Sequence, residues 1–124
     1  MGFSFAGAAS MEMQVLEATD SLSRVALLGM LDLGGVSEVE TRFLAATVAR
    51  GKPTIVDLAG LSFISSLGMG MLLTAVKGLK RKGAKLVLLH PQPNIVMALK
   101  AARLHELLPL VDSEEQARQM LAAE

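Results

Sequence analysis

The sequence predicts an α/β fold: a mixed, mainly parallel sheet of about five strands with about four helices, in the order β-β-α-β-α-β-α-β-α. Three observations lead to this prediction. Short apolar runs, typical of buried strands, alternate with segments whose apolar residues recur at helical spacing. A cluster of turn residues separates the first two runs and suggests an opening antiparallel hairpin. Strands that alternate with helices favour parallel pairing in the rest of the sheet.

Length and composition predict one domain, residues 11–124, preceded by a flexible N-terminal tail, residues 1–10. Hydrophobic residues make up 52% of the chain and aromatic residues only 3%, so aliphatic side chains and eight methionines must fill the core. Twelve Lys and Arg balance twelve Asp and Glu, which argues against nucleic-acid binding. The absence of cysteine excludes disulfides and cysteine-ligated metal. No apolar run approaches the roughly 18–20 residues of a membrane span, and we expect a cytoplasmic protein.

The first two strands are expected at residues 11–18 and 24–31. In the first strand, Met11, Met13 and Val15 alternate with polar residues, as in a strand with one buried face. The second strand is almost wholly apolar, which is typical of a central strand buried on both faces. A polar turn between them completes the expected hairpin.

The first helix is expected to begin at Ser37–Glu40, a capping box. Its serine can accept a hydrogen bond from the first helical turn while its last glutamate reaches back. The helix should reach about Arg50, with Phe43 on its apolar face. Gly51 is placed to cap the C-terminus, and Pro53 prevents continuation.

The remaining strands and helices alternate. We expect them, in order, as a strand at 54–58, a helix at 66–82, a strand at 85–89, a helix from Pro93, a strand at 107–111 and a helix from Ser113 nearly to Glu124. Pro93 suits a first helical position, and Ser113–Gln116 is a second capping box. The chain therefore continues as a regular strand–helix alternation to its end.

A pair of hydroxyls, Ser65 and Ser66, is the best candidate for a functional group. They follow a buried strand and open a helix, at the strand edge where open α/β sheets build their sites. The amides and dipole of a helix N-terminus tolerate a phosphate, which would add roughly −1.5 to −2 charges at pH 7 without melting the helix. That suits a switch read by a partner. Serine is also a common helix cap with no further role, and this alternative stays open.

Two glycines in the first turns of the same helix, Gly68 and Gly70, add to this picture. Each is unfavourable in a helix interior by about 0.8–1 kcal/mol relative to alanine. Their presence suggests that another backbone or a partner approaches closely. Simple packing of the helix on a strand would account for them equally well.

Two motifs resemble a known family. The segment Asp57–Gly68, Asp-Leu-Ala-Gly-Leu-Ser-Phe-Ile-Ser-Ser-Leu-Gly, resembles the signature of STAS domains, the anti-sigma-factor antagonists. The segment Gly29–Asp32 is similar to the Gly-x-Leu-Asp that closes the second strand in that family. The order of elements over about residues 11–123 also fits. The resemblance implies a STAS-like fold and a non-enzymatic binding module, for which we expect no cofactor and no metal.

The resemblance also implies partners. In that family the unphosphorylated protein binds an anti-sigma factor that is also a serine kinase with a histidine-kinase-like ATPase fold, and a sigma factor is released. The kinase then phosphorylates a serine of the antagonist and ends the interaction. A metal-dependent serine phosphatase resets the system. No direct insertion into a membrane and no nucleic-acid contact are expected.

The family pattern assigns the site residues. Aligned on Phe63 and Gly68, Ser66 occupies the phosphorylated position. Ser65 stands where the family usually has Asp and is a rival acceptor, and Leu67 replaces a frequent Ser or Thr. The expected partner-binding residues are Asp32, Gly34, Gly35, Ser65, Ser66, Leu67, Gly68 and Met69, with Met71 at the edge of that surface. Core packing is the open alternative for the two methionines. For Asp32 a capping role is an open alternative, and Asp57 is expected to be structural.

Two other functions are weaker alternatives. The first is a STAS-type scaffolding subunit of a transporter or signalling complex, in which the serine would only cap its helix. The second is a small hydrolase, but Ile64 interrupts the Gly-x-Ser-x-Gly pattern around Ser66. His90 and His105 are the only possible bases, and two isolated histidines form no recognisable metal site.

Overall fold

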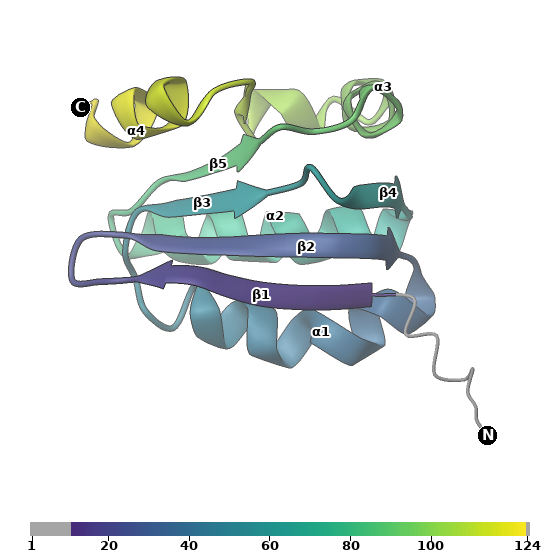
Figure 1. Ribbon diagram of the computed structural model, residues 1–124, viewed down its shortest axis with the longest axis horizontal. Coiled ribbons are helices and arrows are strands. Elements are labelled where there is room, and N and C mark those ends of the chain that lie inside the picture. Colours follow the sequence, from purple (N-terminus) through teal and green to yellow (C-terminus); the bar gives the residue numbers. More distant parts are fainter. Residues whose placement is uncertain (1–10, 124) are drawn as a thin grey trace.

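The computed structural model describes residues 11–123, so the predicted tail at 1–10 lies outside the described residues. Figure 1 shows helices packed on a twisted sheet. The elements are β1 (Met11–Ala18), β2 (Ser23–Leu31), α1 (Leu33–Ala46), β3 (Thr54–Asp57), β4 (Leu61–Ile64), α2 (Ser66–Arg81), β5 (Leu86–Leu89), α3 (Pro93–Ala101), the 3-10 turn η1 (Leu104–Glu106), β6 (Leu110–Val111) and α4 (Glu114–Ala122).

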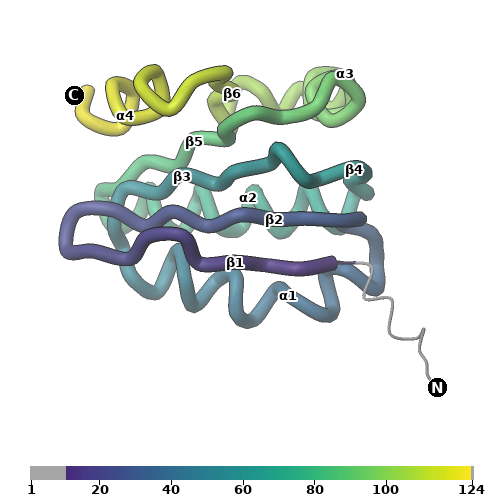
Figure 2. The backbone as a smooth tube through the Cα atoms, in the orientation of Figure 1, coloured from purple at the N-terminus to yellow at the C-terminus, as the bar shows by residue number. Residues whose placement is uncertain are grey.

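The sheet has six strands and confirms the mixed, mainly parallel topology. Its order is β1-β2-β3-β5-β6, with β4 paired to β2 outside this path. Only the β1–β2 pair is antiparallel, and β2–β3, β2–β4, β3–β5 and β5–β6 are all parallel. Figure 2 traces the opening β1–β2 hairpin and the later strands beside it. Strands β3, β5 and β6 run in the same direction as β2.

The segment between β3 and α2 contains a strand that the sequence prediction missed. Residues 59–65 were expected to form a short loop, but β4 pairs in parallel with the end of β2, where Met30 lies opposite Phe63. The nine-residue β2 is longer than the four-residue β3, so its last residues need another partner. Strand β3 ends at Asp57, whose carboxylate accepts a hydrogen bond from the Ala59 amide at 2.9 Å. The chain becomes extended again in β4.

Helix α1 begins earlier than its capping box predicts. Its N-cap is Asp32, and Ser37 is an exposed residue inside the helix. The helix also ends at Ala46, before the expected Arg50. Glycines at 34 and 35 resemble a loop in the sequence, yet the helix needs a small residue at Gly35, because that residue packs closely on Met30 of β2. Gly51 adopts a φ of +67° and ends the turn that follows the helix.

The alternation expected in β1 holds only for its first half. Met11 is buried and Met13 half-buried, but Val15 and Leu16 are both exposed. The register with β2 shifts between Val15 and Glu17. A bulge of this kind rotates the strand, so the periodicity of two cannot continue through it.

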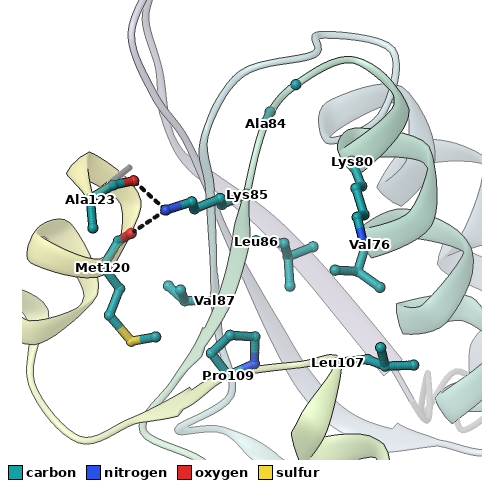
Figure 3. A pocket seen from close by; sticks show the side chains of 11 residues that line it. Val76, Lys80, Ala84, Lys85, Leu86, Val87, Leu107, Pro109, Met120 and Ala123 are labelled. Atoms are coloured by element: carbon teal, nitrogen blue, oxygen red, sulfur yellow. Dashed lines mark hydrogen bonds between the residues drawn. The ribbon is translucent and has the colours of Figure 1, made fainter.

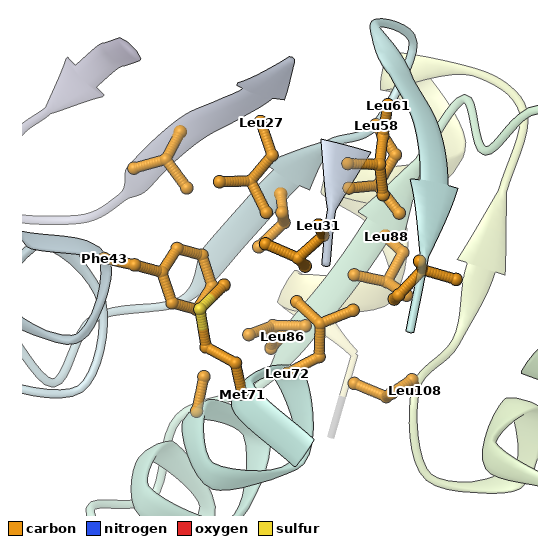
Figure 4. Close-up of a cluster of buried hydrophobic side chains, with 14 of the residues drawn as sticks. Leu27, Leu31, Phe43, Leu58, Leu61, Met71, Leu72, Leu86, Leu88 and Leu108 are labelled. Carbon is orange, nitrogen blue, oxygen red and sulfur yellow. The ribbon is translucent and has the colours of Figure 1, made fainter. Parts of the chain in front are cut away.

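The sheet buries apolar side chains on both faces. The main cluster lies between the sheet and α1, α2 and α3, and includes Phe43, Leu72 and Leu31 (Figure 4). A smaller cluster forms on the other face, where Ala117 of α4 packs near Val87 of β5. Full burial of each large side chain stabilises the fold by about 1.5–3 kcal/mol.

Ion pairs join α4 to the sheet. The Arg24 guanidinium lies 2.6 Å from Glu114 and 3.6 Å from Asp57. Arg118 lies 2.9 Å from Glu114 and 3.3 Å from Glu17. The hydrogen bond from Arg24, followed by that from Arg118, lowers the pKa of Glu114. These contacts hold α4 to strands β1, β2 and β3, so they contribute to the scaffold.

Candidate functional site: two helix N-termini beside the end of β2

The N-termini of α1 and α2 meet at the carboxyl end of β2. Strand β2 ends at Leu31 and α1 begins at Leu33, while α2 begins at Ser66 directly after β4 ends at Ile64. Because β4 pairs with the end of β2, both helices start at the same end of the sheet. The Ser65 amide donates to the Leu31 carbonyl at 3.0 Å and ties the two starts together.

Ser65 is the N-cap of α2 and is fully engaged. Its hydroxyl accepts from the Gly68 amide at 3.2 Å and donates to the Leu31 carbonyl at 2.9 Å. The side chain is half-buried. This geometry gives Ser65 a structural role, since it satisfies one unpaired amide of the first turn and holds the helix to β2.

Ser66 occupies the first helical position and differs from its neighbour. It is exposed, and its hydroxyl makes no hydrogen bond to any residue that the structure describes. At this position the side chain projects from the positive end of the α2 dipole. The serine pair therefore divides into one structural hydroxyl and one accessible hydroxyl.

Asp32 caps α1 in the same way that Ser65 caps α2. Its Oδ1 accepts from the Gly35 amide at 2.8 Å, and its carbonyl accepts from the Val36 amide at 2.8 Å. The capping alternative left open for Asp32 is thus confirmed. A carboxylate at this place also offsets the positive end of the helix dipole.

Each helix packs its third residue directly against β2. A Cβ added to Gly35 would lie 2.2 Å from the Met30 carbonyl oxygen. A Cβ added to Gly68 would lie 2.7 Å from the Leu31 carbonyl oxygen. Gly68 is therefore explained by packing of the helix on a strand. A Cβ on Gly70, by contrast, would meet nothing within 4 Å.

Exposed apolar side chains lie on the elements that carry the two caps and on the strands that precede them. Among the described residues, four of the eight exposed large hydrophobic side chains lie at this end of the sheet: Met30 at 42%, Leu33 at 67%, Phe63 at 43% and Leu67 at 52% exposure. We name these four the terminal patch. Met30 and Phe63 face each other across β2 and β4, while Leu33 and Leu67 lie in the first turns of α1 and α2. Exposed large apolar side chains that gather at one end of a soluble protein are typical of an interaction site.

The structure brings most of the predicted partner-binding residues together at one end. Asp32, Gly34 and Gly35 form the start of α1, and Ser65–Gly68 form the start of α2. The methionines behave differently. Met69 is half-buried and packs against the core. Met71 is buried, so its expected place at the edge of this surface is wrong.

Sequence patterns did not predict three of the four residues in the terminal patch. Met30 and Phe63 belong to strands, and Leu33 belongs to a segment expected to be a loop. Their only sequence signal is an apolar residue next to a motif position, which is indistinguishable from a core residue until the register is known. Leu67 alone was included, because it lies between the two motif positions.

The two histidines are distant from the serine pair in the sequence and are not hydrogen-bonded to it. His90 follows β5 with a φ of 57°, and His105 lies in η1. No hydrogen bond joins either one to a serine among residues 11–123. That part of the chain also holds no group of three His, Cys, Asp or Glu side chains arranged to bind a metal. None of the described helices is long and apolar enough to cross a membrane.

Comparison with known proteins identifies the family. Residues 13–117 match the model of the STAS domain. This chain belongs to the STAS domain family. The matched residues include the N-termini of α1 and α2 and strand β2, on which both helices pack.

Proteins named as anti-sigma factor antagonists are similar to this STAS domain. The chain is 30% identical over 86 residues to the anti-sigma F factor antagonist of Lysinibacillus sphaericus, which covers 68% of this chain and 74% of that protein. A crystal structure of an anti-sigma factor antagonist from Mycobacterium paratuberculosis superposes with a TM-score of 0.81 at 21% identity, covering 94% of this chain and 98% of that chain. The fold prediction is thereby confirmed.

The Bacillus anti-sigma factor antagonist SpoIIAA is known in two forms that both share this fold. The unphosphorylated form superposes with a TM-score of 0.73 at 22% identity, covering 91% of this chain and 99% of that chain. The phosphorylated form superposes with a TM-score of 0.65 at 23% identity, covering 88% and 98%.

Proposed function

We propose that this STAS domain is a cytoplasmic, non-enzymatic anti-sigma-factor antagonist that is switched by phosphorylation of Ser66. The unphosphorylated form binds an anti-sigma factor that is also a serine kinase with a histidine-kinase-like ATPase fold. The kinase transfers the γ-phosphoryl group of ATP to the Ser66 Oγ, which loses its proton, and ADP leaves. The phosphorylated antagonist dissociates, and a metal-dependent serine phosphatase later removes the phosphate with water.

The observation that carries this proposal is the contrast between the two serine hydroxyls. Ser66 is exposed and has no hydrogen-bond partner among the described residues, so a kinase can reach it without breaking structure. Ser65 would have to give up its donated hydrogen bond to Leu31 and its position in the cap. The contrast favours Ser66 over its rival as the acceptor.

A phosphate on Ser66 would change the surface while leaving the fold intact. The start of α2 has no acidic residue in its first turn, and its dipole favours an anion. Leu67 and the rest of the terminal patch supply the apolar surface that a protein partner would cover. A dianion beside that surface opposes association through repulsion and the cost of desolvation.

Two further observations support the partner-binding role. The open space above Gly70 leaves room for another backbone at the second turn of α2. The relatives described above are anti-sigma factor antagonists, and one of them exists in both phosphorylated and unphosphorylated forms. We place the partner surface at Asp32, Gly34, Gly35, Ser65–Gly68 and Met69, extended by the terminal patch.

The decisive experiment incubates the full chain with ATP and each candidate anti-sigma kinase of its organism and maps phosphate by mass spectrometry. We expect phosphate on Ser66 in the wild type and in Ser65→Ala, and none in Ser66→Ala. Ser66→Ala should still bind the kinase but fail to dissociate. Ser66→Glu should bind about tenfold more weakly or worse.

Ser21→Glu is the matched control, because Ser21 is an exposed serine in the turn at the opposite end of the hairpin. Its binding should equal that of the wild type. Phosphate on Ser65 in the wild type would move the acceptor by one residue and contradict our assignment.

A scaffolding STAS subunit is the second candidate. Ser65 replaces the Asp that the family usually carries before its acceptor, and its hydroxyl is fully used as a cap. This function predicts that a complex forms but that no kinase phosphorylates the chain. Ser66→Ala and Ser66→Glu would then bind the partner equally well.

A further inference from the structure

A cavity lies at the other end of α2 from Ser66, where that helix ends and β5 begins (Figure 3). It has a volume of about 540 Å³. This size lies within the roughly 300–1,000 Å³ of small-ligand pockets. The 16 residues of α2 span about 24 Å, so the cavity is separate from the two helix N-termini.

The walls of the cavity are apolar and come from four parts of the chain. Val76 contributes from α2 and Val87 from β5. Leu107 and Pro109 contribute from the segment after η1, and Met120 from α4. Figure 3 shows Val76 and Leu107 on one side of β5 and Val87 and Met120 on its other side. Such walls suit a hydrocarbon chain, because its burial removes apolar surface from water on both partners.

Two lysines supply the charge at this site. Lys85 donates to the carbonyl oxygen of Met120 at 3.4 Å and to that of Ala123, so it links the start of β5 to the end of α4. The Lys80 side chain runs along α2 toward Val76 (Figure 3) and makes no hydrogen bond or ion pair with a described residue. No Asp or Glu is among the described residues that line the cavity. The charge is therefore complementary to an anion.

We propose that this cavity binds a single-chain aliphatic carboxylate of medium length. The chain lies against Val76, Val87 and Met120, and the carboxylate pairs with the ammonium group of Lys80 at the mouth. Nothing in this inference depends on the phosphorylation of Ser66. A neutral hydrocarbon or an apolar side chain of another protein would use the walls but not the charge, so the test separates these occupants.

The test titrates the full chain with hexanoate, octanoate, decanoate and 1-decanol by calorimetry, at concentrations where each is monomeric. We expect saturable 1:1 binding whose affinity rises about fourfold per added methylene until the cavity is full. Decanoate should bind about fivefold more tightly than 1-decanol, as a single exposed ion pair would give. Equal affinity for the acid and the alcohol, or no saturable binding, would overturn the proposal.

Two lysine variants locate the carboxylate. Lys80→Met should remove the fivefold preference for decanoate and leave 1-decanol unchanged. Lys77→Met is the matched control on the same helix, because Lys77 is exposed and does not line the cavity, and it should behave as the wild type. Loss of the preference in Lys77→Met, or its retention in Lys80→Met, would contradict the assignment.

Methyl NMR locates the chain. Decanoate should shift the methyl resonances of Val76, Val87 and Met120 and leave those of Leu33 and Leu67 unchanged. Shifts confined to Leu33 and Leu67 would mean adsorption on the terminal patch and would overturn the proposal.

Discussion

Helices α1 and α2 start in the same way but present different chemistry. In each, a side-chain oxygen of the N-cap accepts from the amide three residues later, and that third residue is a glycine pressed against a carbonyl of β2. The cap of α1 is a carboxylate, Asp32, followed by Leu33. The cap of α2 is neutral, Ser65, followed by the hydroxyl of Ser66.

The difference between the two caps gives the two helix N-termini different electrostatic properties. The α1 dipole is already offset by a fixed negative charge at Asp32. The α2 dipole has no acidic residue in its first turn, so its positive end can respond to an added anion. The same backbone frame therefore provides one permanently compensated terminus and one that a phosphate can compensate reversibly.

The largest difference between the two helix N-termini should appear in the free energy of unfolding when the close-packed glycines are replaced by alanine. Gly35→Ala places a Cβ 2.2 Å from a backbone oxygen, and Gly68→Ala places one 2.7 Å from the next. We expect losses in the free energy of unfolding of about 3 kcal/mol and about 1–2 kcal/mol. Urea unfolding followed by far-ultraviolet circular dichroism measures both, since the chain has no Trp or Tyr for fluorescence. A larger loss at Gly68 would break the ranking.

Gly70→Ala is the control for helix propensity. Its new Cβ meets nothing within 4 Å, so the substitution should raise the free energy of unfolding by about 0.5–1 kcal/mol. A loss at Gly70 similar to that at Gly68 would mean that the close approach to β2 is not the cause.

The second effect concerns the caps themselves. Asp32→Ala and Ser65→Ala should each lower the free energy of unfolding by about 1–2 kcal/mol, because an amide in the first turn loses its acceptor. The two losses should differ in their dependence on salt. The Asp32 loss includes a charge–dipole contribution that high salt screens, whereas the Ser65 loss is between neutral groups.

Asp32→Asn tests the electrostatic part alone, since an amide oxygen still accepts from Gly35. We expect it to lose about 0.3–1 kcal/mol at low salt and almost nothing at high salt. Equal salt dependence of the Asp32 and Ser65 variants would show that the two termini are electrostatically alike, contrary to the comparison above.

The sequence predicts the frame of this site better than its surface. Periodicity and capping patterns place α2, α3 and α4 within a residue or two, and the family motif identifies the serine pair. The start of α1 was missed because Gly34 and Gly35 are unfavourable in helices, and only the contact with Met30 explains the need for a small residue. Local propensity contains no information about that tertiary contact.

The terminal patch and β4 could not be predicted for a related reason. Whether Met30 or Phe63 faces the core or solvent depends on the pairing register, and β4 is a strand only because β2 extends beyond β3. Which of Ser65 and Ser66 has a structural role, and which stays accessible, likewise depends on which of them is the N-cap of the helix. A shift of one residue in the helix start would exchange their roles.

The smallest effect tests the electrostatic difference at the first helical position. Ser66→Glu adds a negative charge where α2 has none, so it should raise the free energy of unfolding by about 0.3–1 kcal/mol relative to Ser66→Gln at low salt. The same comparison at Leu33, Glu against Gln, should give less, because Asp32 already lies beside it. Denaturation at low and high salt measures both pairs. If the two gains are equal, Asp32 does not offset the α1 dipole; if Ser66→Glu destabilises the chain, a phosphate at this position would strain the helix it is proposed to leave intact.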